Sequence, residues 1–540
     1  MSKSMPRWRA RTRSPRSKRD NIPLVFALFS GLLLGCAFPP VGWDWLVWVG
    51  LVPLLLVVHR ADHPRRAFWL GWLAGCTFFL IVLHPLVSVE SWVGWVQETR
   101  TAMHGRLSRQ WWFMHGIWLA FSVWCALIWG LWAALLRQWG RGRWTRVITA
   151  VALWIVLPEW LRARTTFGFE WAFLGNACAH WPAVCQVAAL GGVALLSGLV
   201  VLVNVGLAAF VSSRRAERGW WVVPVFALEC LAIIWLWGST MLDAAVSSAR
   251  PISVALLQYH QPSVAREEDY SSLGLIRGYE PLARNAIQHG AQIIVLSESA
   301  MRGVVSLDGS PSPSRPPNRT YTLASWNSLV QSLLQGSDAV AIIGINAAAN
   351  AHDYNSMGAW TARGPIGWYH KRRLVPFAEY RPSGWGTWVI RSDSLDVPGQ
   401  GSQLWQFPGM TVGTFICQEV LFGNLMRESV LDGAELLVSG GNDGVFANPA
   451  VAKVHEDAAQ LRAVETGRYI VRAMKTGISA VIDPTGREVV RSQMNAPALL
   501  FARASPRSVI TPYVWFGDWM VCLSALLAFL IAGFQRRRRG

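Results

Sequence analysis

The chain has 540 residues, of which 52% are hydrophobic and only 15% are charged, against about 25% charged residues in soluble domains. This composition excludes an ordinary soluble enzyme and indicates an integral membrane protein. The formal net charge of +18 is concentrated in short loops between apolar segments and at the two termini. Such a distribution sets membrane topology, and we therefore expect no nucleic-acid partner.

The first half of the chain reads as a series of membrane spans. Residues 1–21 carry eight Lys or Arg and no apolar run, which predicts a basic cytoplasmic tail. Residues 22–243 then predict a seven-helix transmembrane domain, since most of its apolar segments approach the ~20 residues that a helix needs to cross the hydrocarbon layer. The segments lie at about 22–39, 41–58, 67–88, 111–136, 147–161, 183–211 and 220–242.

An eighth apolar segment, 513–534, predicts a C-terminal transmembrane helix, and a second basic tail follows at 535–540. Arginines occupy alternate loops between the spans, so a cytoplasmic N-terminus places all of these loops in the cytoplasm. With seven spans before it, the stretch 251–508 is expected on the opposite face. The arginines are Arg60, Arg65 and Arg66, then Arg137, Arg141, Arg143 and Arg146, then Arg214, Arg215 and Arg218.

Residues 251–508 have the sequence pattern of a soluble domain, in which β-rich apolar runs alternate with segments of helical spacing. This pattern predicts a layered α/β domain. Three polar residues each stand at the end of an apolar strand: Glu298, Lys371 and Cys417. Cys417 is the only cysteine of this stretch, so a disulfide within it is excluded.

These three residue types permit a specific chemistry. Cysteine attacks as a thiolate, so its proton must be removed. A carboxylate can act as base and later as acid, and an ammonium can stabilise the oxyanion of a tetrahedral intermediate. Together they suit acyl transfer through a thioester. Each also has a structural interpretation, since Glu298 could cap a helix, Lys371 could be a solvated charge, and Cys417 could be a small buried hydrophobe.

At these residues the chain resembles the carbon–nitrogen hydrolase (nitrilase) superfamily, whose triad runs Glu, Lys, Cys in this order. Within it, nearly the whole chain is similar to the apolipoprotein N-acyltransferase family. The most specific piece is Tyr369-His370-Lys371 leading into Leu374-Val375-Pro376-Phe377-Ala378-Glu379-Tyr380. Further matches are Leu190-Gly191-Gly192, Asn442-Asp443-Gly444, His455 and Arg462-Ala463-Val464-Glu465.

The resemblance implies a fold and a set of roles. The fold would be a bundle of about eight transmembrane helices joined to a four-layer α-β-β-α sandwich. Glu298 would be the general base, Lys371 the oxyanion stabiliser and Cys417 the nucleophile. Glu379 would hold Lys371 or support the intermediate, and Glu419 would line the site. A structural role is expected for His455, and no metal or cofactor is expected.

The implied reaction moves an acyl chain from a phospholipid to Cys417, and then to the α-amine of the N-terminal diacylglyceryl-cysteine of a bacterial lipoprotein. The expected enzyme is a monomer in the bacterial inner membrane, with the catalytic domain on the periplasmic side.

Several residues depart from the family pattern. Leu296-Ser297 stand where Trp-Pro usually precedes the base, Gln418 replaces a tyrosine, and Val445 replaces an aromatic residue. Lys475 replaces an asparagine, and Ala378 replaces a glycine. Two alternatives therefore stay open. One is a divergent membrane acyltransferase or amidase that uses the same triad on another amine or amide. The other is a catalytically silent homologue that binds lipids or lipoproteins.

Overall fold

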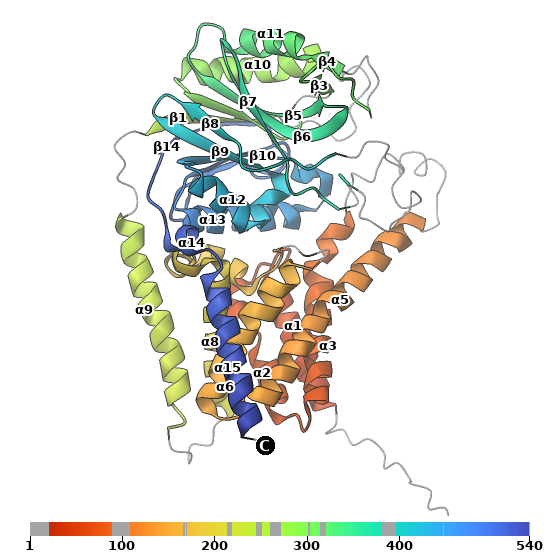
Figure 1. The fold of residues 1–540 in the computed structure, drawn as a ribbon, viewed down its shortest axis with the longest axis vertical. Coiled ribbons are helices and arrows are strands. Elements are labelled where there is room, and N and C mark those ends of the chain that lie inside the picture. Colours follow the sequence, from red (N-terminus) through yellow and green to blue (C-terminus); the bar gives the residue numbers. More distant parts are fainter. Residues whose placement is uncertain are drawn as a thin grey trace, which may run out of the picture.

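The computed structural model shows a helical half and an α/β half stacked end to end (Figure 1). The tail 1–21, apart from its last residue, lies outside the described residues, as do Ala378 and residues 539–540. The described residues are 21–88, 109–165, 168, 170–212, 219–244, 251–259, 272–300, 303–313, 320–376, 379–380, 396–446 and 448–538.

Six helices in the described part of the chain are long and apolar enough to cross a membrane. They correspond to six of the eight predicted segments, and α1 (Ile22–Cys36) corresponds to a seventh but is shorter. The count of eight spans stays a prediction. The six are α3 (Pro64–Val82), α5 (Arg109–Trp139), α6 (Arg143–Trp154) with the π-helical turn Ile155–Leu161, α8 (Ala188–Ser212), α9 (Val222–Ala244) and α15 (Trp519–Arg537).

The segment predicted as a second span, 41–58, is not one helix. It consists of a 3-10 turn, η2 (Asp44–Trp48), and a short helix, α2 (Val52–Arg60). The side chain of Asn204 on α8 compensates the break, because it accepts from Leu51 N and donates to Val47 O, each at 2.9 Å. An unpaired amide in hydrocarbon would cost several kcal/mol, so irregular backbone is tolerated at this depth only where protein groups satisfy it.

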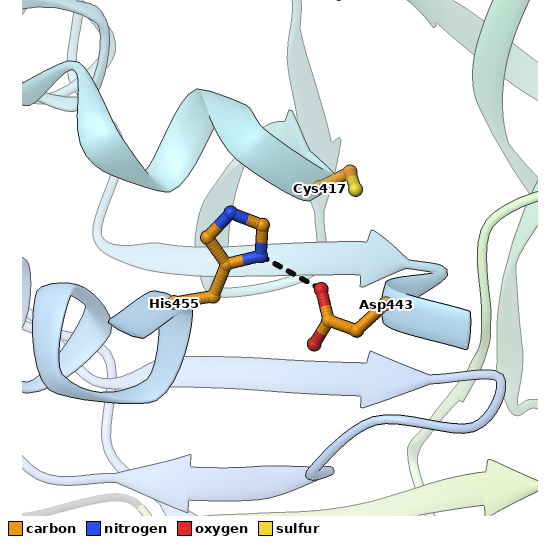
Figure 2. A group of neighbouring side chains, drawn as sticks. All are labelled: Cys417, Asp443 and His455. Carbon is orange, nitrogen blue, oxygen red and sulfur yellow. Dashed lines mark hydrogen bonds and ion pairs between the residues drawn. The ribbon is translucent and has the colours of Figure 1, made fainter. Parts of the chain in front are cut away.

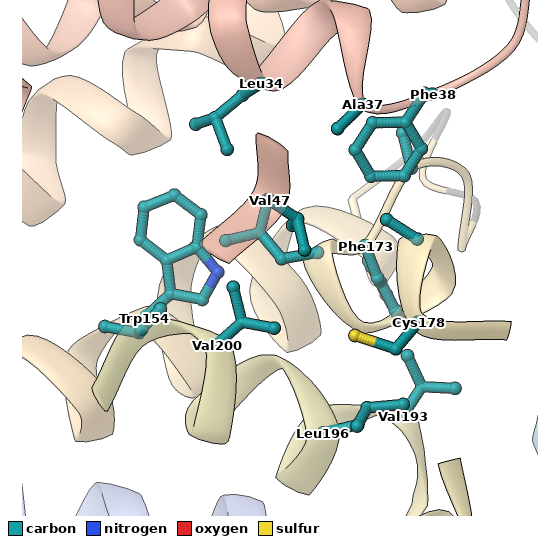
Figure 3. Close-up of a cluster of buried hydrophobic side chains, with 14 of the residues drawn as sticks. Leu34, Ala37, Phe38, Val47, Trp154, Phe173, Cys178, Val193, Leu196 and Val200 are labelled. Atoms are coloured by element: carbon teal, nitrogen blue, oxygen red, sulfur yellow. The ribbon is translucent and has the colours of Figure 1, made fainter. Parts of the chain in front are cut away.

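The bundle core is built from branched aliphatic and aromatic side chains of several helices (Figure 3). Trp154 of α6 is buried, and its ring lies 4.9 Å from the rings of both Trp129 and Trp132 on α5. Leu34, Val47 and Val200 belong to the same cluster. This packing brings α1, η2, α6 and α8 together around the broken second segment.

The α/β half contains two sheets. The eight-stranded sheet has the order β14-β1-β2-β5-β3-β4, with β6 and β7 added through β5. Its strands are β1 (Ile252–Gln258), β2 (Ile293–Leu296), β3 (Val304–Ser306), β4 (Thr320–Thr322), β5 (Val340–Ala349), β6 (His352–Thr361), β7 (Gly364–His370) and β14 (Ala498–Ala504).

The six-stranded sheet has the order β13-β12-β11-β10-β9-β8. Its strands are β8 (Leu404–Phe407), β9 (Met410–Ile416), β10 (Leu436–Gly441), β11 (Ile470–Met474), β12 (Ala480–Ile482) and β13 (Glu488–Arg491).

Helices cover the outer face of each sheet (Figure 1). The eight-stranded sheet is covered by α10 (Ser272–Gln288) and α11 (Leu323–Leu334), and the six-stranded sheet by α12 (Gly423–Leu431) and α13 (Pro449–Thr466). The predicted four-layer α-β-β-α sandwich is therefore confirmed. Because β1, β2 and β5 are parallel to one another, as are β9, β10 and β11, their carboxyl ends gather polar residues at common edges.

One helix of the sandwich, α13, docks directly on the membrane bundle. On α8 the helix is interrupted at Gly192, whose φ is 70°, and the amide of Val193 donates to Glu465 Oε1 at 2.8 Å. Arg462 donates to the same Glu465 oxygen at 3.0 Å and lies 3.4 Å from Glu170 Oε2. We call Arg462, Glu465 and Glu170 the domain latch, because they join α13 to the outer face of the bundle.

Candidate active site

The structure brings Glu298, Lys371 and Glu379 into one buried ionic group. Glu298 follows β2 and Lys371 follows β7, at the edge where these strands end. The Lys371 ammonium lies 3.3 Å from Glu298 Oε1 and 2.7 Å from Glu379 Oε1, and its side chain is 1% exposed. A solvated surface charge, the structural interpretation of Lys371, is therefore wrong.

Asn355 on β6 belongs to this group, although the sequence did not single it out. Its amide donates to Glu298 Oε1 at 2.6 Å and to Glu379 Oε1 at 2.8 Å. Glu379 also accepts from Val375 N at 2.7 Å, which fixes the second carboxylate oxygen. Asn355 and Lys371 thus hold the two carboxylates at one fixed separation. A polar residue inside a strand of mixed composition gives no distinguishing sequence signal.

Cys417 stands at a sharp turn between β9 and the 3-10 helix η9 (Cys417–Leu421). Its φ is 54°, a left-handed conformation that non-glycine residues adopt at a cost and that clusters at functional sites. Such a strand-to-helix turn presents a nucleophile away from the sheet. The sulfur lies within the electrostatic reach of Glu298 and Lys371.

The protonation states follow from burial and from these neighbours. Burial, followed by the charge of Glu298, raises the pKa of the Cys417 thiol well above its usual value, although the Lys371 ammonium lowers it. Burial by itself would lower the pKa of Lys371, but Glu298 and Glu379 hold it well above its usual value. At neutral pH the site therefore pairs a thiol with an ammonium, and the sulfur needs a base to become a nucleophile.

Glu419 accepts hydrogen bonds from residues that flank both Cys417 and Lys371. One oxygen accepts from the Tyr369 hydroxyl at 2.8 Å and from Ile416 N at 2.7 Å, and the other accepts from Arg372 N at 2.7 Å and Arg373 N at 3.0 Å. It is completely buried, and burial raises its pKa. Glu419 therefore ties the turn of Cys417 to the loop that follows Lys371, whereas the sequence led us to expect a residue that lines the pocket.

Cys417, Asp443 and His455 form a second group at the same turn, with one ligand atom of each within 4.8 Å of the others (Figure 2). Asp443 Oδ1 lies 2.7 Å from His455 Nδ1, and its Oδ2 accepts from Arg472 at 3.1 Å. Burial alone would raise the pKa of Asp443, but His455 and Arg472 lower it.

This second group does not have the character of a metal centre. The carboxylate of Asp443 is already neutralised by a guanidinium, and the raised pKa of Cys417 disfavours the thiolate that a soft metal ion requires. We interpret Asp443 and His455 as a hydrogen-bonded support under the Cys417 turn, in agreement with the structural role expected for His455.

Comparisons with known proteins cover nearly the whole chain. The family described as Apolipoprotein N-acyltransferase N-terminal domain matches residues 30–206, and Carbon-nitrogen hydrolase matches residues 253–510. An apolipoprotein N-acyltransferase of Gloeobacter violaceus is 32% identical and aligns over 97% of this chain and 96% of its own length. The chain belongs to the apolipoprotein N-acyltransferase family.

A second apolipoprotein N-acyltransferase, from Synechocystis sp., is 25% identical over 93% of this chain and 98% of its own length. Among solved structures, an amidase from Nesterenkonia sp. covers 51% of this chain and 96% of its own, at 16% identity and a TM-score of 0.35.

The departures from the apolipoprotein N-acyltransferase pattern lie around the triad. The amide of Gln418 points to the neighbouring loop, where it donates to Arg373 O at 3.0 Å. Val445 is followed by Phe446, which is buried and places its ring 6.4 Å from that of His455. Lys475 donates to Ser299 O at 3.2 Å, and Ser299 directly follows Glu298 in the chain. An aromatic ring thus follows one position after Val445, and the ammonium of Lys475 lies beside the residue after Glu298.

Proposed function

We propose that this protein is an apolipoprotein N-acyltransferase in which Glu298, Lys371 and Cys417 carry the chemistry. The observation that carries the proposal is the buried Lys371 ammonium, held between Glu298 and Glu379 beside the Cys417 sulfur. The Lys371 ammonium lies near a sulfur that can attack and a carboxylate that can take its proton, and a purely structural ion pair needs neither.

In the first half-reaction, Glu298 removes the Cys417 proton and the sulfur attacks an ester carbonyl of a phospholipid. The oxygen that becomes negative lies toward Lys371, whose charge lowers the barrier. The intermediate collapses when the carbon–oxygen bond breaks, and the proton on Glu298 passes to the departing lysophospholipid. The product is an acyl thioester on Cys417.

In the second half-reaction, the α-amine of the diacylglyceryl-cysteine attacks the thioester carbonyl. Glu298 accepts a proton from the attacking nitrogen and returns it to the leaving sulfur. The products are an amide and the free thiol, so the enzyme is ready for another phospholipid. Lys371 serves both half-reactions without changing its charge.

The position of the site suits two substrates that are held in a bilayer. Trp171, in the loop region after α6, donates its ring N–H to Val82 O at the end of α3 and lies 6.3 Å, ring to ring, from His455. Because His455 belongs to the group around Cys417, the reacting sulfur is a few side chains from the outer face of the helix bundle.

We further propose the expected topology, with residues 251–508 on the periplasmic side of a bacterial inner membrane. Transmembrane segments at 22–243 and 513–534 and cytoplasmic tails at 1–21 and 535–540 complete it. The ends of α9 at Ala244 and of β14 at Ala504 are consistent with these boundaries. We propose a monomer, since the site draws all of its residues from one chain.

The test uses the purified full-length protein with a phospholipid and a synthetic diacylated lipopeptide, and mass spectrometry of the peptide. We expect a triacylated peptide from the wild type and from Cys522→Ala, which removes an exposed cysteine of α15. We expect none from Cys417→Ala. Triacylation by Cys417→Ala would refute the assignment. Acyl-enzyme formation without triacylated peptide would favour the amidase or another amine acceptor.

A further inference from the structure

A basic pocket lies at the end of the bundle opposite the α/β half. Its volume is ≈ 460 Å³, within the range of ligand sites. It is enclosed by the last turns of α2, α5 and α8 and by the first turns of α6 and α9. The lining includes four arginines and one histidine and, among the described residues, no Asp or Glu. These five are His59, Arg137, Arg141, Arg143 and Arg146.

The positive charge of this pocket is incompletely compensated. Arg137 donates its Nε to the carbonyl of Ala61. Arg146 has a buried Nε that meets no hydrogen-bond acceptor among the residues described in the structure. Like charges that lie close together repel one another, and the described lining residues include no carboxylate to offset them. An anion in the pocket lowers this repulsion.

The start of α6 adds backbone donors to the same pocket. The residue before its first turn is Gly142, with φ 97° and no side chain that could cap the helix. The first turn carries Arg143 and Arg146, although the positive end of a helix dipole favours acidic side chains. Uncapped amides at such an end bind phosphate groups. The first turn of α6 therefore has no acidic side chain to bind its amides, and these amides can bind an external anion.

The walls and the rim of the pocket show what kind of anion fits. Apolar side chains, including Leu55 and Val205, line the part that is continuous with the bundle. Near the rim, Trp144 and Trp221 are exposed, and Trp144 packs on Phe226 with ring centres 5.3 Å apart. Exposed tryptophans of a membrane protein favour the depth of the lipid headgroups. A pocket that has charged residues at its rim and apolar side chains on its walls, at the depth of the headgroups, fits a lipid better than a free ion.

We propose that this pocket binds the phosphodiester headgroup of an anionic glycerophospholipid in the leaflet opposite the catalytic domain. In the proposed topology this is the cytoplasmic leaflet. Basic pockets between membrane helices on that side recognise such headgroups. The bound lipid is distinct from the acyl donor, because the helix ends that line the pocket lie at the end of the bundle away from the α/β half, to which Cys417 belongs (Figure 1). Its role is to hold the ends of α2, α5, α6, α8 and α9 together.

The test is a thermal-shift titration of the full-length protein in neutral detergent with dioctanoyl-phosphatidylglycerol. We expect a saturable rise in Tm, because a ligand that binds only the folded state stabilises it. Dioctanoyl-phosphatidylcholine and inorganic phosphate should give no such rise. The double variant Arg141→Gln/Arg146→Gln should bind roughly 30-fold more weakly, at about 1 kcal/mol for each arginine.

The matched control is Arg65→Gln/Arg66→Gln, which removes two exposed arginines at the same end of the bundle but outside the pocket. It should bind phosphatidylglycerol like the wild type. If the pocket variant does not fold, Arg141→Glu, which reverses one exposed charge, should weaken binding instead. The proposal is overturned if phosphatidylcholine stabilises equally, if the pocket variants bind undiminished, or if inorganic phosphate displaces the lipid at equal concentration.

Discussion

The active site and the domain latch are two versions of one arrangement, a single buried cation between two carboxylates. In the active site Lys371 lies between Glu298 and Glu379, and in the latch Arg462 lies between Glu465 and Glu170. What differs is how the carboxylates use their remaining oxygens. The second oxygen of Glu465, Oε2, lies 2.7 Å from Arg462 Nε, whereas the hydrogen bonds that described residues make to Glu298 all end on Oε1.

Charge and burial alone therefore do not separate a catalytic group from a structural one. The latch uses a guanidinium, which stays protonated and donates through a rigid planar fork. The active site uses a compact ammonium, and next to it stand a thiol and a carboxylate with an oxygen available for a proton. The latch should therefore control stability, and the active site should control rate.

The substitution that best separates the active site from the domain latch is Lys371→Met. Without the ammonium, the oxyanion loses its stabilising charge, and acyl transfer should fall by about 10²–10³-fold or more. Two carboxylates would be left without a cation, so the folded state should also lose about 3–5 kcal/mol. Rates of acyl-enzyme formation and the Tm measure both effects. Arg373→Met, at an exposed neighbour in the same loop, should leave both unchanged.

The corresponding change in the latch is Arg462→Met. It leaves the buried Glu465 without its cation, and Glu170 keeps only Arg164, at 4.0 Å, so it should cost about 3–5 kcal/mol of stability. Alkylation of Cys417 by a soluble thiol reagent should proceed at nearly the wild-type rate in the folded variant, since no triad residue is touched. If Arg462→Met lost as much reactivity of Cys417 as it lost acyl transfer, the active site and the domain latch would not be separable.

The latch should also give stability a characteristic dependence on pH. Burial raises the pKa of Glu465 to about 7, although Arg462 lowers it, whereas an unfolded glutamate titrates near ~4.3. Between these values the folded state binds more protons than the unfolded state. Its stability therefore falls as the pH rises from about 4 to about 7, by up to roughly 4 kcal/mol from this group.

Glu465→Gln removes this titration, so its unfolding free energy should vary less with pH over the same window. Denaturant melts of both proteins at several pH values measure the difference. Identical slopes in the variant and the wild type would assign the pH dependence to other groups.

The smallest effect is expected from Asn355→Leu, which removes the neutral donor shared by Glu298 and Glu379. Lys371 still pairs with both carboxylates, so transfer should fall by only about tenfold, equivalent to about 1–2 kcal/mol of lost hydrogen bonding. The loss should appear in kcat, while KM for the phospholipid stays near its wild-type value. A change confined to KM would place Asn355 in substrate binding.

The sequence predicted those features that a short stretch encodes. Strand-end positions and residue chemistry identified Glu298, Lys371 and Cys417, and alternating strands and helices predicted the α/β sandwich. Asn355 was missed because an amide within β6 has no local signature. The break in the second segment was missed because hydropathy averages over Gly50 and Pro53, which only the structure shows to be element boundaries.

The latch could not be predicted either, because its partners are far apart in the chain. Arg462 and Glu170 are separated by 292 positions, and each reads as an ordinary charge in its own segment. Only the docking of α13 on the bundle brings them together. Long-range ion pairs of this kind depend on the arrangement of whole domains, which local patterns do not specify.

The most direct test is the intact mass of the protein after incubation with a phospholipid of defined chains and no acceptor. If the proposed function is right, we expect a gain of one acyl chain, located on Cys417 and released by hydroxylamine, in the wild type and in folded Arg462→Met, but not in Cys417→Ala. An acyl group that persists in Cys417→Ala, or an unmodified wild-type protein that nevertheless acylates the lipopeptide, would contradict it.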